Sequence, residues 1–494
     1  MGELIFVKEM MPRKKGRRAK MPGPKKPKAR KPPARKLPAR KTIAKRSISR
    51  GISSKNSRPV DRIGAVLSEI LPLIKPSPQE AASELAFAES IRDHISSNAP
   101  EGTETVIVGS MAKGTFLRDK RDIDIFVLFD PKFPRSGLEP AVRAIMARAF
   151  RDLNYQVSYA EHPYVRFHSD GRRIDLVPAY KITCAAERVS AVDRSVLHTV
   201  FVVDSLRKGQ EGEVLLLKQF LRANGIYGAE IKTEGFSGYL CELLIIKYGT
   251  FTNLLRSASK WKENVFIDLE VAYKRSGIPA AHERFGGFVV IDPTDRNRNV
   301  AAAVSSKSLR RFISLSKAFL KRPSKEFFLR EMPDFEELME RFSKKRIAFV
   351  VSMPRPAIVD DVLWGQLKKM CGQLEAHLDD FSCPEIITDD SRHLVRLGIV
   401  LKTERLPDMM LVAGPPLGMK KHVKDFRKSH PKAKFIMKSG KIWTQVKRPI
   451  TKADAAIRQF FRLFSKTKSH LAYPEEMLVI ERFEAGAKTK GKKK

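Results

Sequence analysis

Hydrophobic and polar residues follow two different periods along this chain, and the two periods predict helices and strands. Residues 79–95 repeat Leu85, Ile91 and Ile95 at helical spacing among good helix formers, which predicts an amphipathic helix. Residues 122–130 instead alternate acidic and apolar positions, as a half-buried strand would. Further elements expected here are a short buried strand at 104–110, a helix at 139–153 with Val142, Ile145, Met146 and Phe150 on one face, and strands at 156–160, 164–168 and 172–178. The first part of the chain is therefore expected to be mixed α/β.

The pattern becomes helical after about residue 209 and mixed again in the last third. Helices are expected at 212–225, 237–249 and 308–323, ending at Gly225, at Gly249 and before Pro323. Strands at 347–354, 396–402 and 409–414 and helices at 362–378 and 455–464 are expected beyond them. The 494 residues are enough for about three domains. We therefore expect an α+β multidomain protein without internal repeats.

Basic residues dominate the charge of the chain. The 94 Lys and Arg exceed the 55 Asp and Glu and give a formal net charge of +39, which attracts polyanions such as nucleic acid. Solubility alone needs far less charge. Residues 1–50 hold 19 Lys and Arg against two Glu, with interleaved prolines, and are expected to be disordered. This segment is either a mobile polycation that tethers RNA or a solvated appendage.

The cysteines and the apolar runs indicate in which cellular compartment the protein is expected. Cys184, Cys241, Cys371 and Cys383 are scattered and form no CxxC pair, so the sequence suggests neither a zinc knuckle nor a disulfide framework. The apolar run at residues 4–7 is too short for a signal sequence or a membrane span. A cytoplasmic location without a membrane segment is expected.

Two aspartates two positions apart, Asp122 and Asp124, are the candidate chemical centre. Alternate side chains of a strand share a face, so the two carboxylates lie about 6 to 7 Å apart at the level of their Cα atoms. Magnesium prefers hard oxygen ligands completed by substrate phosphates, which suits carboxylates. Asp175 completes a triad if its strand is a neighbour. Alone, however, this pattern is common, and two solvated carboxylates on an outer face are the plainer interpretation.

The segment before these aspartates has features of a phosphate-binding turn. A strand ends on Gly109 and Ser110, small residues that let backbone N–H groups approach a triphosphate, and the N-terminus of a following helix would favour its charge. Lys113 and Arg118 follow and would add positive charge. The order of a strand, a Gly-Ser turn, an Asp-x-Asp strand and a third Asp-bearing strand is more specific than any one of these parts.

These motifs carry a resemblance to a known family. Gly-Ser followed after eleven residues by DID, and then by IDLVPAY at 174–180, resembles the nucleotidyltransferase superfamily of polymerase beta, and more closely the archaeal, class I CCA-adding tRNA nucleotidyltransferases. The resemblance covers roughly residues 60–450; it continues through YAEHPYV, SAVDRSVLH, residues 216–245 and 289–305, and weakly through VAGPPLGMKKHVKDFR. One departure is LRDKRDID, which stands where a glycine-containing turn is expected and puts the loop shape in doubt, but not the carboxylates.

The resemblance implies a fold and an order of domains. It implies a polymerase beta-like nucleotidyltransferase head, a helical central domain, and an α+β C-terminal body and tail. The expected ranges are a disordered basic extension at 1–58, the head at 59–208, the helical neck at 209–322, an RNA-binding body and tail at 323–485, and a basic tail at 486–494.

The resemblance also implies roles for individual residues. Asp122, Asp124 and Asp175 would be the catalytic carboxylates at two Mg²⁺ ions; the first two would coordinate both ions, and Asp175 would help to position the 3′ hydroxyl of the RNA. Around the nucleotide would lie Gly109, Ser110, Lys113, His198, Lys218 and Tyr227, with Arg298 at its base, while Tyr159, aligned less securely, would meet the RNA end. The plainer interpretations are a satisfied, partly buried His198, a Lys218 whose stem lies along an apolar helix with its ammonium in water, a Tyr227 that covers a turn, and a surface Arg298.

The implied activity is template-independent addition and repair of the 3′-terminal CCA of tRNA. The RNA 3′ hydroxyl would attack the α-phosphate of CTP or ATP and release pyrophosphate. The implied partners are tRNA, CTP and ATP, and a homodimer is left open. A poly(A) polymerase or other terminal transferase would share the carboxylates, whereas a non-catalytic RNA-binding protein on a degenerate transferase would lack one. A repair DNA polymerase is disfavoured because it should depend on a template strand.

Overall fold

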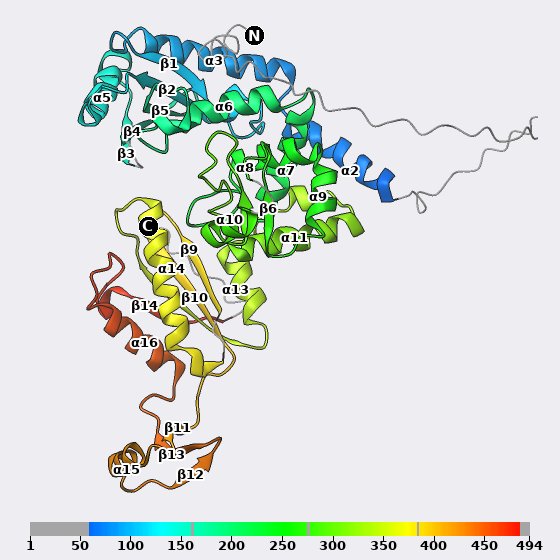
Figure 1. Ribbon diagram of the computed structural model, residues 1–494. Coiled ribbons are helices and arrows are strands. Elements are labelled where there is room, and N and C mark those ends of the chain that lie inside the picture. Colours follow the sequence, from blue (N-terminus) through cyan, green and yellow to red (C-terminus); the bar gives the residue numbers. More distant parts are fainter. Residues whose placement is uncertain (1–58, 160–162, 274–276, 383–384, 485–494) are drawn as a thin grey trace, which may run out of the picture. The chain divides into compact units, whose positions relative to one another are not determined.

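The computed structural model describes residues 59–159, 163–273, 277–382 and 385–484, which divide into two compact units (Figure 1). Unit 1 holds the described chain up to Gly228 and then Gly235–Leu329. Unit 2 holds Ala229–Glu234 and the described chain from Arg330 onward. The predicted basic segments at 1–58 and 486–494 lie outside the described residues, and the finer domain boundaries at 209 and 323 stay predictions.

A five-stranded sheet of order β1-β2-β5-β4-β3 forms the first part of unit 1. Its central strands β2 and β5 run parallel, and the other neighbouring pairs are antiparallel. The strands are β1 (Glu104–Val108), β2 (Ile123–Phe129), β3 (Tyr155–Tyr159), β4 (Pro163–Ser169) and β5 (Arg172–Tyr180). All five lie where the sequence predicts strands.

Helices cover both faces of this sheet. They are α3 (Pro78–Ser96) and α5 (Leu138–Ala149) on one face and α6 (Arg194–Ser205) on the other. The odd-numbered residues of β2, such as Ile125, face α3 and α5, whereas Phe126 and Leu128 lie with Val196 of α6. The expectation that this strand is half-buried is therefore wrong beyond Asp124, because both faces are covered from Ile125 onward.

The predicted amphipathic helix is α3, and its N-terminus forms a capping box between Ser77 and Glu80. Its buried side includes Ala88, Ile91 and Ile95. Glu84 is buried there too, since its carboxylate pairs with Arg172 at 2.7 Å and with Arg121 at 3.1 Å. A charged residue on a buried face is tolerated when it is paired in this way.

A helical core built around phenylalanines forms the rest of unit 1. Its helices are α2 (Pro59–Ile74), α7 (Gln210–Ala223), α8 (Gly238–Tyr248), α9 (Phe251–Ala258), α10 (Ile278–Phe285), α11 (Ser306–Lys321) and α12 (Glu326–Leu329), accompanied by the parallel strands β6 (Val265–Ile267) and β7 (Phe288–Val290). Phe220 lies at the centre, with Phe251, Phe319 and Phe328 edge-on to its ring. α2 contributes Ile70 to this core, although the expected head begins at residue 59.

Unit 2 contains an antiparallel sheet of order β14-β8-β10-β9. The strands are β8 (Ile347–Pro354), β9 (Glu385–Asp390), β10 (Leu394–Leu401) and β14 (Val479–Arg482), and the helices are α13 (Phe335–Ser343), α14 (Asp360–His377) and α16 (Ala453–Phe464). α14 and α16 cover the face that carries Val351 and Leu397, and α13 covers the face that carries Ala348 and Val400.

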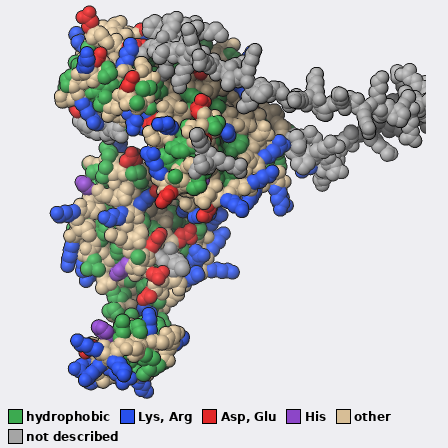
Figure 2. Space-filling view, in the orientation of Figure 1, with side chains coloured by type: hydrophobic (Ala, Val, Ile, Leu, Met, Phe, Trp, Pro, Cys, Tyr) green, Lys and Arg blue, Asp and Glu red, His purple; other side chains and the backbone are tan. Residues whose placement is uncertain are grey.

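A small three-stranded sheet of order β11-β13-β12 also belongs to unit 2. It consists of β11 (Met409–Pro416), β12 (Phe435–Lys438) and β13 (Lys441–Lys447), with α15 (Lys420–Ser429) beside it. No residue of α15 is buried. Figure 2 shows Lys and Arg side chains gathered over this part of the chain.

Candidate active site

The three predicted carboxylates lie on one face of the sheet in unit 1. Asp122 directly precedes β2, and Asp124 is the second residue of that strand. Asp124 and Asp175 are register partners on the parallel strands β2 and β5. Because Ile123, Ile125, Ile174 and Leu176 point toward α3 and α5, the aspartates between them point to the opposite face. The condition under which Asp175 completes the triad, neighbouring strands, is thus met.

The carboxylates interact electrostatically. Burial and the neighbouring charges of Asp175 and Asp122 together raise the pKa of Asp124 to about 6, against the opposing charges of Arg173 and Lys113. A carboxyl group whose pKa is raised by burial and by neighbouring like charges is a typical feature of functional sites. The arrangement favours a cation at this face.

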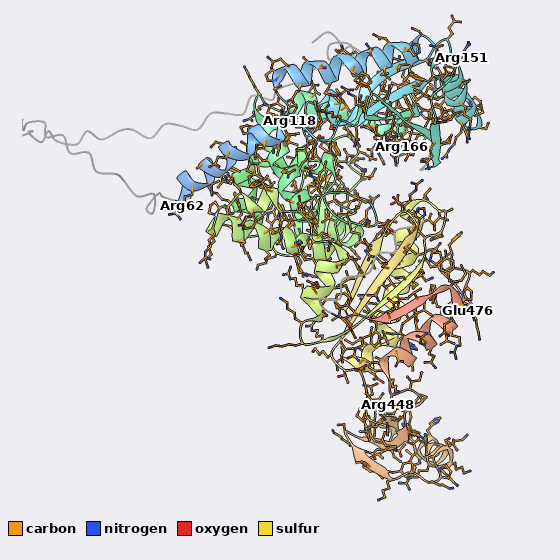
Figure 3. The ribbon with its side chains drawn as sticks, turned by 180° about the vertical axis from the view of Figure 1, so that it is seen from behind. Arg62, Arg118, Arg151, Arg166, Arg448 and Glu476 are labelled. Carbon is orange, nitrogen blue, oxygen red and sulfur yellow. The ribbon has the colours of Figure 1, made fainter. Side chains whose placement is uncertain are left out.

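Two arginines that the sequence reasoning missed hold the outer carboxylates. Arg166 donates two hydrogen bonds to Asp175, from Nε at 2.7 Å and from Nη2 at 2.8 Å. Arg173 donates from Nη2 to Asp122 Oδ2 at 2.7 Å. Arg166, labelled in Figure 3, stands opposite Asp175 in the antiparallel β4–β5 pair, and Arg173 precedes Asp175 by two residues on the same strand. The even spacing of Arg173 and Asp175 could have signalled their shared face.

Three carboxylates on one face are the donor chemistry that Mg²⁺ prefers. As the side chains stand, no three His, Cys, Asp or Glu residues of the described chain form a metal-ion cluster. Asp122 and Asp175 turn instead to their arginine partners. The donor set therefore fits a divalent cation, and binding of such an ion would replace these guanidinium contacts.

A glycine is required at position 109, because the backbone there lies close to the carboxylate of Asp124. Its φ of +73° lies in the left-handed region, and a Cβ at this position would be 2.1 Å from Asp124 Oδ2. Ser110 follows in α4 (Gly109–Ala112). This helix is a single turn, so the expected helix-terminus field is not supported there. The backbone of the turn nevertheless lies directly against the carboxylate.

Lys113 and Lys218 meet in a buried ionic network around Glu242, a residue that the sequence reasoning missed. Glu242 accepts from Lys113 Nζ at 2.6 Å, from Lys218 Nζ at 3.2 Å and from Thr115 Oγ1 at 2.7 Å. Although burial acts to raise the pKa of Glu242, the two lysine charges outweigh it and the pKa is lowered. Burial lowers the pKa of Lys218. The plainer interpretation of Lys218, with its ammonium in water, is wrong, because its side chain is only 3% exposed.

The N-terminus of α8 lies beside this network. A Cβ on Gly238, the first residue of α8, would be 3.3 Å from Tyr227 Oη and 3.6 Å from Lys218 Nζ. Ser237 caps the helix by accepting from Leu240 N. α8 has eleven residues, so its first N–H groups carry a useful part of the helix dipole. A helix N-terminus, a lysine and a tyrosine hydroxyl together suit an anionic group.

His198 and Arg298 share the carboxylate of Asp292, another residue that the sequence reasoning missed. Asp292 Oδ2 lies 2.9 Å from His198 Nε2 and 2.9 Å from Arg298 Nη1. Tyr239 donates to Asp292 Oδ1 at 3.1 Å and stacks on the His198 ring at 4.0 Å between centroids. Burial acts to raise the pKa of Asp292, but the hydrogen bond from His198 and the charge of Arg298 help to lower it. Lys113, 5.9 Å from the Tyr239 ring, links this cluster to the buried network.

Two remaining candidates lie apart from these contacts. Arg118, labelled in Figure 3, pairs with Glu80 at 2.7 Å rather than with any carboxylate of the triad. Tyr159 is the last residue of β3, opposite Pro163, and only its backbone is described.

No helix among the described residues is long and apolar enough to cross a membrane.

Three protein families match consecutive parts of the chain. Residues 88–198 match the family described as nucleotidyltransferase domain, and residues 212–329 match tRNA nucleotidyltransferase, second domain. Residues 344–470 match CCA-adding enzyme, C-terminal domain. The matched stretches follow one another in the order that the resemblance implied.

Curated relatives match most of the chain. The CCA-adding enzyme of Methanocaldococcus jannaschii is 37% identical, over 75% of this chain and 85% of the relative. The CCA-adding enzyme of Methanoregula boonei is 35% identical, over 78% of this chain and 84% of the relative. Among solved structures, a cytoplasmic RNA terminal U-transferase matches with a TM-score of 0.43 and 16% identity, covering 56% of this chain and 100% of that chain, which is too distant to bear on function.

Proposed function

The chain belongs to the family of CCA-adding enzymes, and on that premise we propose that it adds and repairs the 3′-terminal CCA of tRNA without a template, from CTP and ATP. The observation that carries the chemistry is the placement of Asp124 opposite Asp175 on parallel strands, with its carboxylate against Gly109. That placement puts a negatively charged face next to a turn whose backbone can approach phosphates.

Nucleotidyltransferases of this kind generally use divalent metals. We propose that Asp122, Asp124 and Asp175 hold two Mg²⁺ ions. When bound, such ions lower the pKa of the RNA 3′ hydroxyl and neutralise the charge of the triphosphate and of the leaving pyrophosphate. The aspartates position the ions, and Arg166 and Arg173 balance the carboxylate charge before they bind.

The triphosphate binds on the side of Lys113, Lys218 and Tyr227 in this proposal. The two lysines bring two positive charges against the single carboxylate of Glu242, and the N-terminus of α8 adds partial positive charge. The backbone of Gly109 and Ser110 would approach the same group. Because these donors are held in place before the nucleotide arrives, they stabilise the developing charge without reorganisation.

His198 and Arg298 surround the sugar and base in this proposal. Asp292 fixes both side chains through its Oδ2 atom. An arginine held on one side by a carboxylate keeps other donors for the edge of a cytosine or adenine base. His198 is held neutral by burial, which lowers its pKa, so it can serve as a hydrogen-bonding group rather than as a cation.

In this proposal the RNA is bound mainly through its phosphate charge and its helical shape. Tyr159 would meet its end. α15 presents five basic residues against one acidic residue, all of them outside the buried core: Lys420, Lys421, Lys424, Arg427 and Lys428 against Asp425. Basic side chains on an exposed helix suit the phosphates of an A-form stem. The expected cytoplasmic location and a homodimer belong to the same proposal; light scattering of the purified protein would test the latter.

The test is incubation with Mg²⁺ and a tRNA lacking its 3′ CCA, with each nucleotide supplied alone and then in pairs. We expect addition of CMP, CMP and then AMP, with AMP added only after both CMP residues. Incorporation of ATP alone into the same RNA would instead indicate a poly(A) polymerase. Asp124→Ala should add no nucleotide while its RNA binding stays near wild type. RNA binding without any nucleotide addition by the wild-type protein would indicate a non-catalytic RNA-binding protein.

A further inference from the structure

Tyr239, the second residue of α8, lies between the two ionic clusters of unit 1. Its hydroxyl donates to Asp292 Oδ1 at 3.1 Å, and its ring stacks on the imidazole of His198 with 4.0 Å between centroids and 22° between planes. On the other side, the Nζ atom of Lys113 lies 5.9 Å from the centroid of the same ring. The tyrosine is therefore placed against both the base side and the triphosphate side of the proposed nucleotide site.

The carboxylate of Asp292 is surrounded by hydrogen-bond donors. Oδ1 accepts from the Tyr239 hydroxyl and, at 2.9 Å each, from the backbone N–H and the hydroxyl of Thr294. Oδ2 lies 2.9 Å from Arg298 Nη1 and 2.9 Å from His198 Nε2. A carboxyl group with this many donors directed at it is ionised and offers only lone pairs. The Nε2 atom of His198 therefore carries a hydrogen and donates it to Asp292.

The second ring nitrogen of His198 is left as a hydrogen-bond acceptor. Burial lowers the pKa of His198, against the opposing effect of Asp292. The positive charges of Arg298 and Lys113 also lower this pKa, so the ring is neutral near pH 7. A neutral imidazole with its hydrogen on Nε2 has a lone pair on Nδ1. Nδ1 forms no hydrogen bond within the described residues, and 13% of the side chain remains exposed, so the ring can accept from a bound molecule.

An incoming nucleotide offers two kinds of donor to such an acceptor. One is a hydroxyl of the ribose. The other is the exocyclic amino group that cytosine and adenine carry where uracil and guanine carry a carbonyl oxygen. Arg298, which shares the same carboxylate oxygen with His198, supplies donors only. An acceptor beside an arginine suits a ligand that presents both donor and acceptor atoms.

We infer that Tyr239 is a positioning residue that holds His198 as the acceptor for a hydrogen-bond donor of the incoming nucleotide, an inference that rests on the proposed function. The hydroxyl of Tyr239 fixes Asp292, which in turn fixes the Nε2 side of the imidazole. The stacked ring restricts rotation of the imidazole about its Cβ–Cγ bond. A tyrosine that only filled space would use neither contact.

The test compares three variants. Tyr239→Phe removes the hydroxyl and keeps the ring, whereas His198→Phe removes the acceptor and keeps the stack. Tyr180→Phe is the matched control, since Tyr180 is a second tyrosine of unit 1 whose hydroxyl donates at 3.1 Å, to the backbone oxygen of Phe133, and it packs on the α3 and α5 side of the sheet.

The measured quantity is the KM for nucleotide addition to a tRNA lacking its 3′ CCA, with Mg²⁺. The substrates are CTP, 2′-deoxy-CTP, and the ribonucleoside triphosphate of 2-pyrimidinone, which is CTP without the 4-amino group. The analogue that lacks the donor used by His198 should have a KM about tenfold above that of CTP in the wild type, the value of one hydrogen bond. A raised KM for 2′-deoxy-CTP identifies the ribose as the source of the donor, and a raised KM for the other analogue identifies the base.

The variants should change this difference in graded steps. His198→Phe should raise the KM for CTP to that of the analogue, so that the difference disappears. Tyr239→Phe should reduce the difference to about threefold while kcat stays within about twofold, because the catalytic carboxylates keep their places. Tyr180→Phe should keep the wild-type difference in full. Both tyrosine variants lose a hydrogen bond of the same length, so their losses of unfolding free energy should be similar and cannot explain different KM values.

Either of two results would overturn the inference. If neither analogue differs from CTP in the wild type, or if the difference survives in His198→Phe, then His198 accepts no donor of the nucleotide. If Tyr239→Phe keeps the same difference as Tyr180→Phe, then Tyr239 does not position His198. Calorimetric titration of the wild type and the variants with CTP and the analogues keeps the proposed function separate. Binding of CTP without any addition to the RNA would refute the proposed function, while the same comparison made with Kd values would still test the inference.

Discussion

Replacing Glu242 by Gln tests whether one buried carboxylate holds the two lysines next to the proposed triphosphate site. The Glu242 side chain is 1% exposed and lies 2.6 Å from Lys113 Nζ and 3.2 Å from Lys218 Nζ. Gln keeps the size and can still accept from Thr115, but it carries no charge. The two lysines, 7% and 3% exposed, would then be buried close together without a counter-charge.

Removing one partner of a buried ion pair costs about 3–5 kcal/mol, which sets the expected loss of unfolding free energy near neutral pH. Burial already lowers the pKa of Lys218, and loss of Glu242 would lower it further. A lysine whose pKa is lower in the folded than in the unfolded state binds its proton more tightly when unfolded, so stability rises with pH between the two values. The deficit of Glu242→Gln should therefore shrink as the pH is raised toward about 10.4, the pKa of an unperturbed lysine.

The assay combines chemical denaturation with hydrogen exchange of the α7 and α8 amides, because two units need not unfold in one transition. The KM for CTP should rise about tenfold, since the lysines lose the group that positions them. Lys218→Met and the double variant Glu242→Gln/Lys218→Met complete a thermodynamic cycle. The double variant should lose about 1–3 kcal/mol less unfolding free energy than the sum of the two single losses.

One result would refute this reasoning. The free energy of unfolding of Glu242→Gln could lie within about 0.5 kcal/mol of the wild-type value, which is the range of an ordinary surface substitution. If the KM for CTP were also unchanged, Glu242 would not be the counter-ion of the lysines. A stability loss without a change in KM would leave the ion network in place but remove its role in nucleotide binding. Glu242→Asp, which keeps the charge on a shorter stem, should recover part of both effects.

Three further substitutions probe the rest of the site. Gly109→Ala should lower kcat by about 100-fold or more with RNA binding unchanged in a filter assay, because its Cβ would displace the carboxylate of Asp124, 2.1 Å away. Asp124→Asn should abolish addition yet stabilise the protein in EDTA by up to about 3 kcal/mol, because burial and the neighbouring carboxylates raise the pKa of Asp124 to about 6. Thermal melts should show that gain in full above about pH 6 and its loss as the pH falls toward the ordinary range of an aspartate, where the wild-type group is protonated in both states. Arg298→Lys should reduce discrimination between CTP and UTP about tenfold in single-nucleotide assays without unfolding the protein, since His198 still binds Asp292.

The strands and helices of the site could be predicted from period and turn residues, and so could the shared face of Asp122 and Asp124. The role of Asp175 was conditional, because the sequence cannot say which strands are neighbours. β2 and β5 are separated in the chain by β3 and β4, yet they pair in parallel. The coverage of both faces of β2 was missed for the same reason: α6 reaches that face from a later part of the chain.

The ionic partners were harder to predict than the functional residues themselves. Asp292 lies 94 positions from His198, and Glu242 lies 129 positions from Lys113. Ionic partners are side chains that lie close together in the folded protein. The period and the spacing of residues along the sequence do not show which distant side chains these are. The face of Arg173 could be predicted, since Arg173 stands two residues before Asp175 on one strand, but its partner Asp122 lies 51 positions away.

Lys218 shows that a stronger prediction was available from the same residues. Its ammonium could reach water only if one side of α7 faced solvent, but residues 214–221 read VLLLKQFL and are apolar on every side except at the lysine and one glutamine. A helix of this kind is buried all round, and every residue from Val214 to Leu221 is buried. A lysine there needs a counter-charge inside the protein. Residues 238–246, GYLCELLII, are a second apolar stretch and contain a single charge, Glu242. Pairing the lone charges of these two stretches would have predicted the contact between Lys218 and Glu242 that the structure contains.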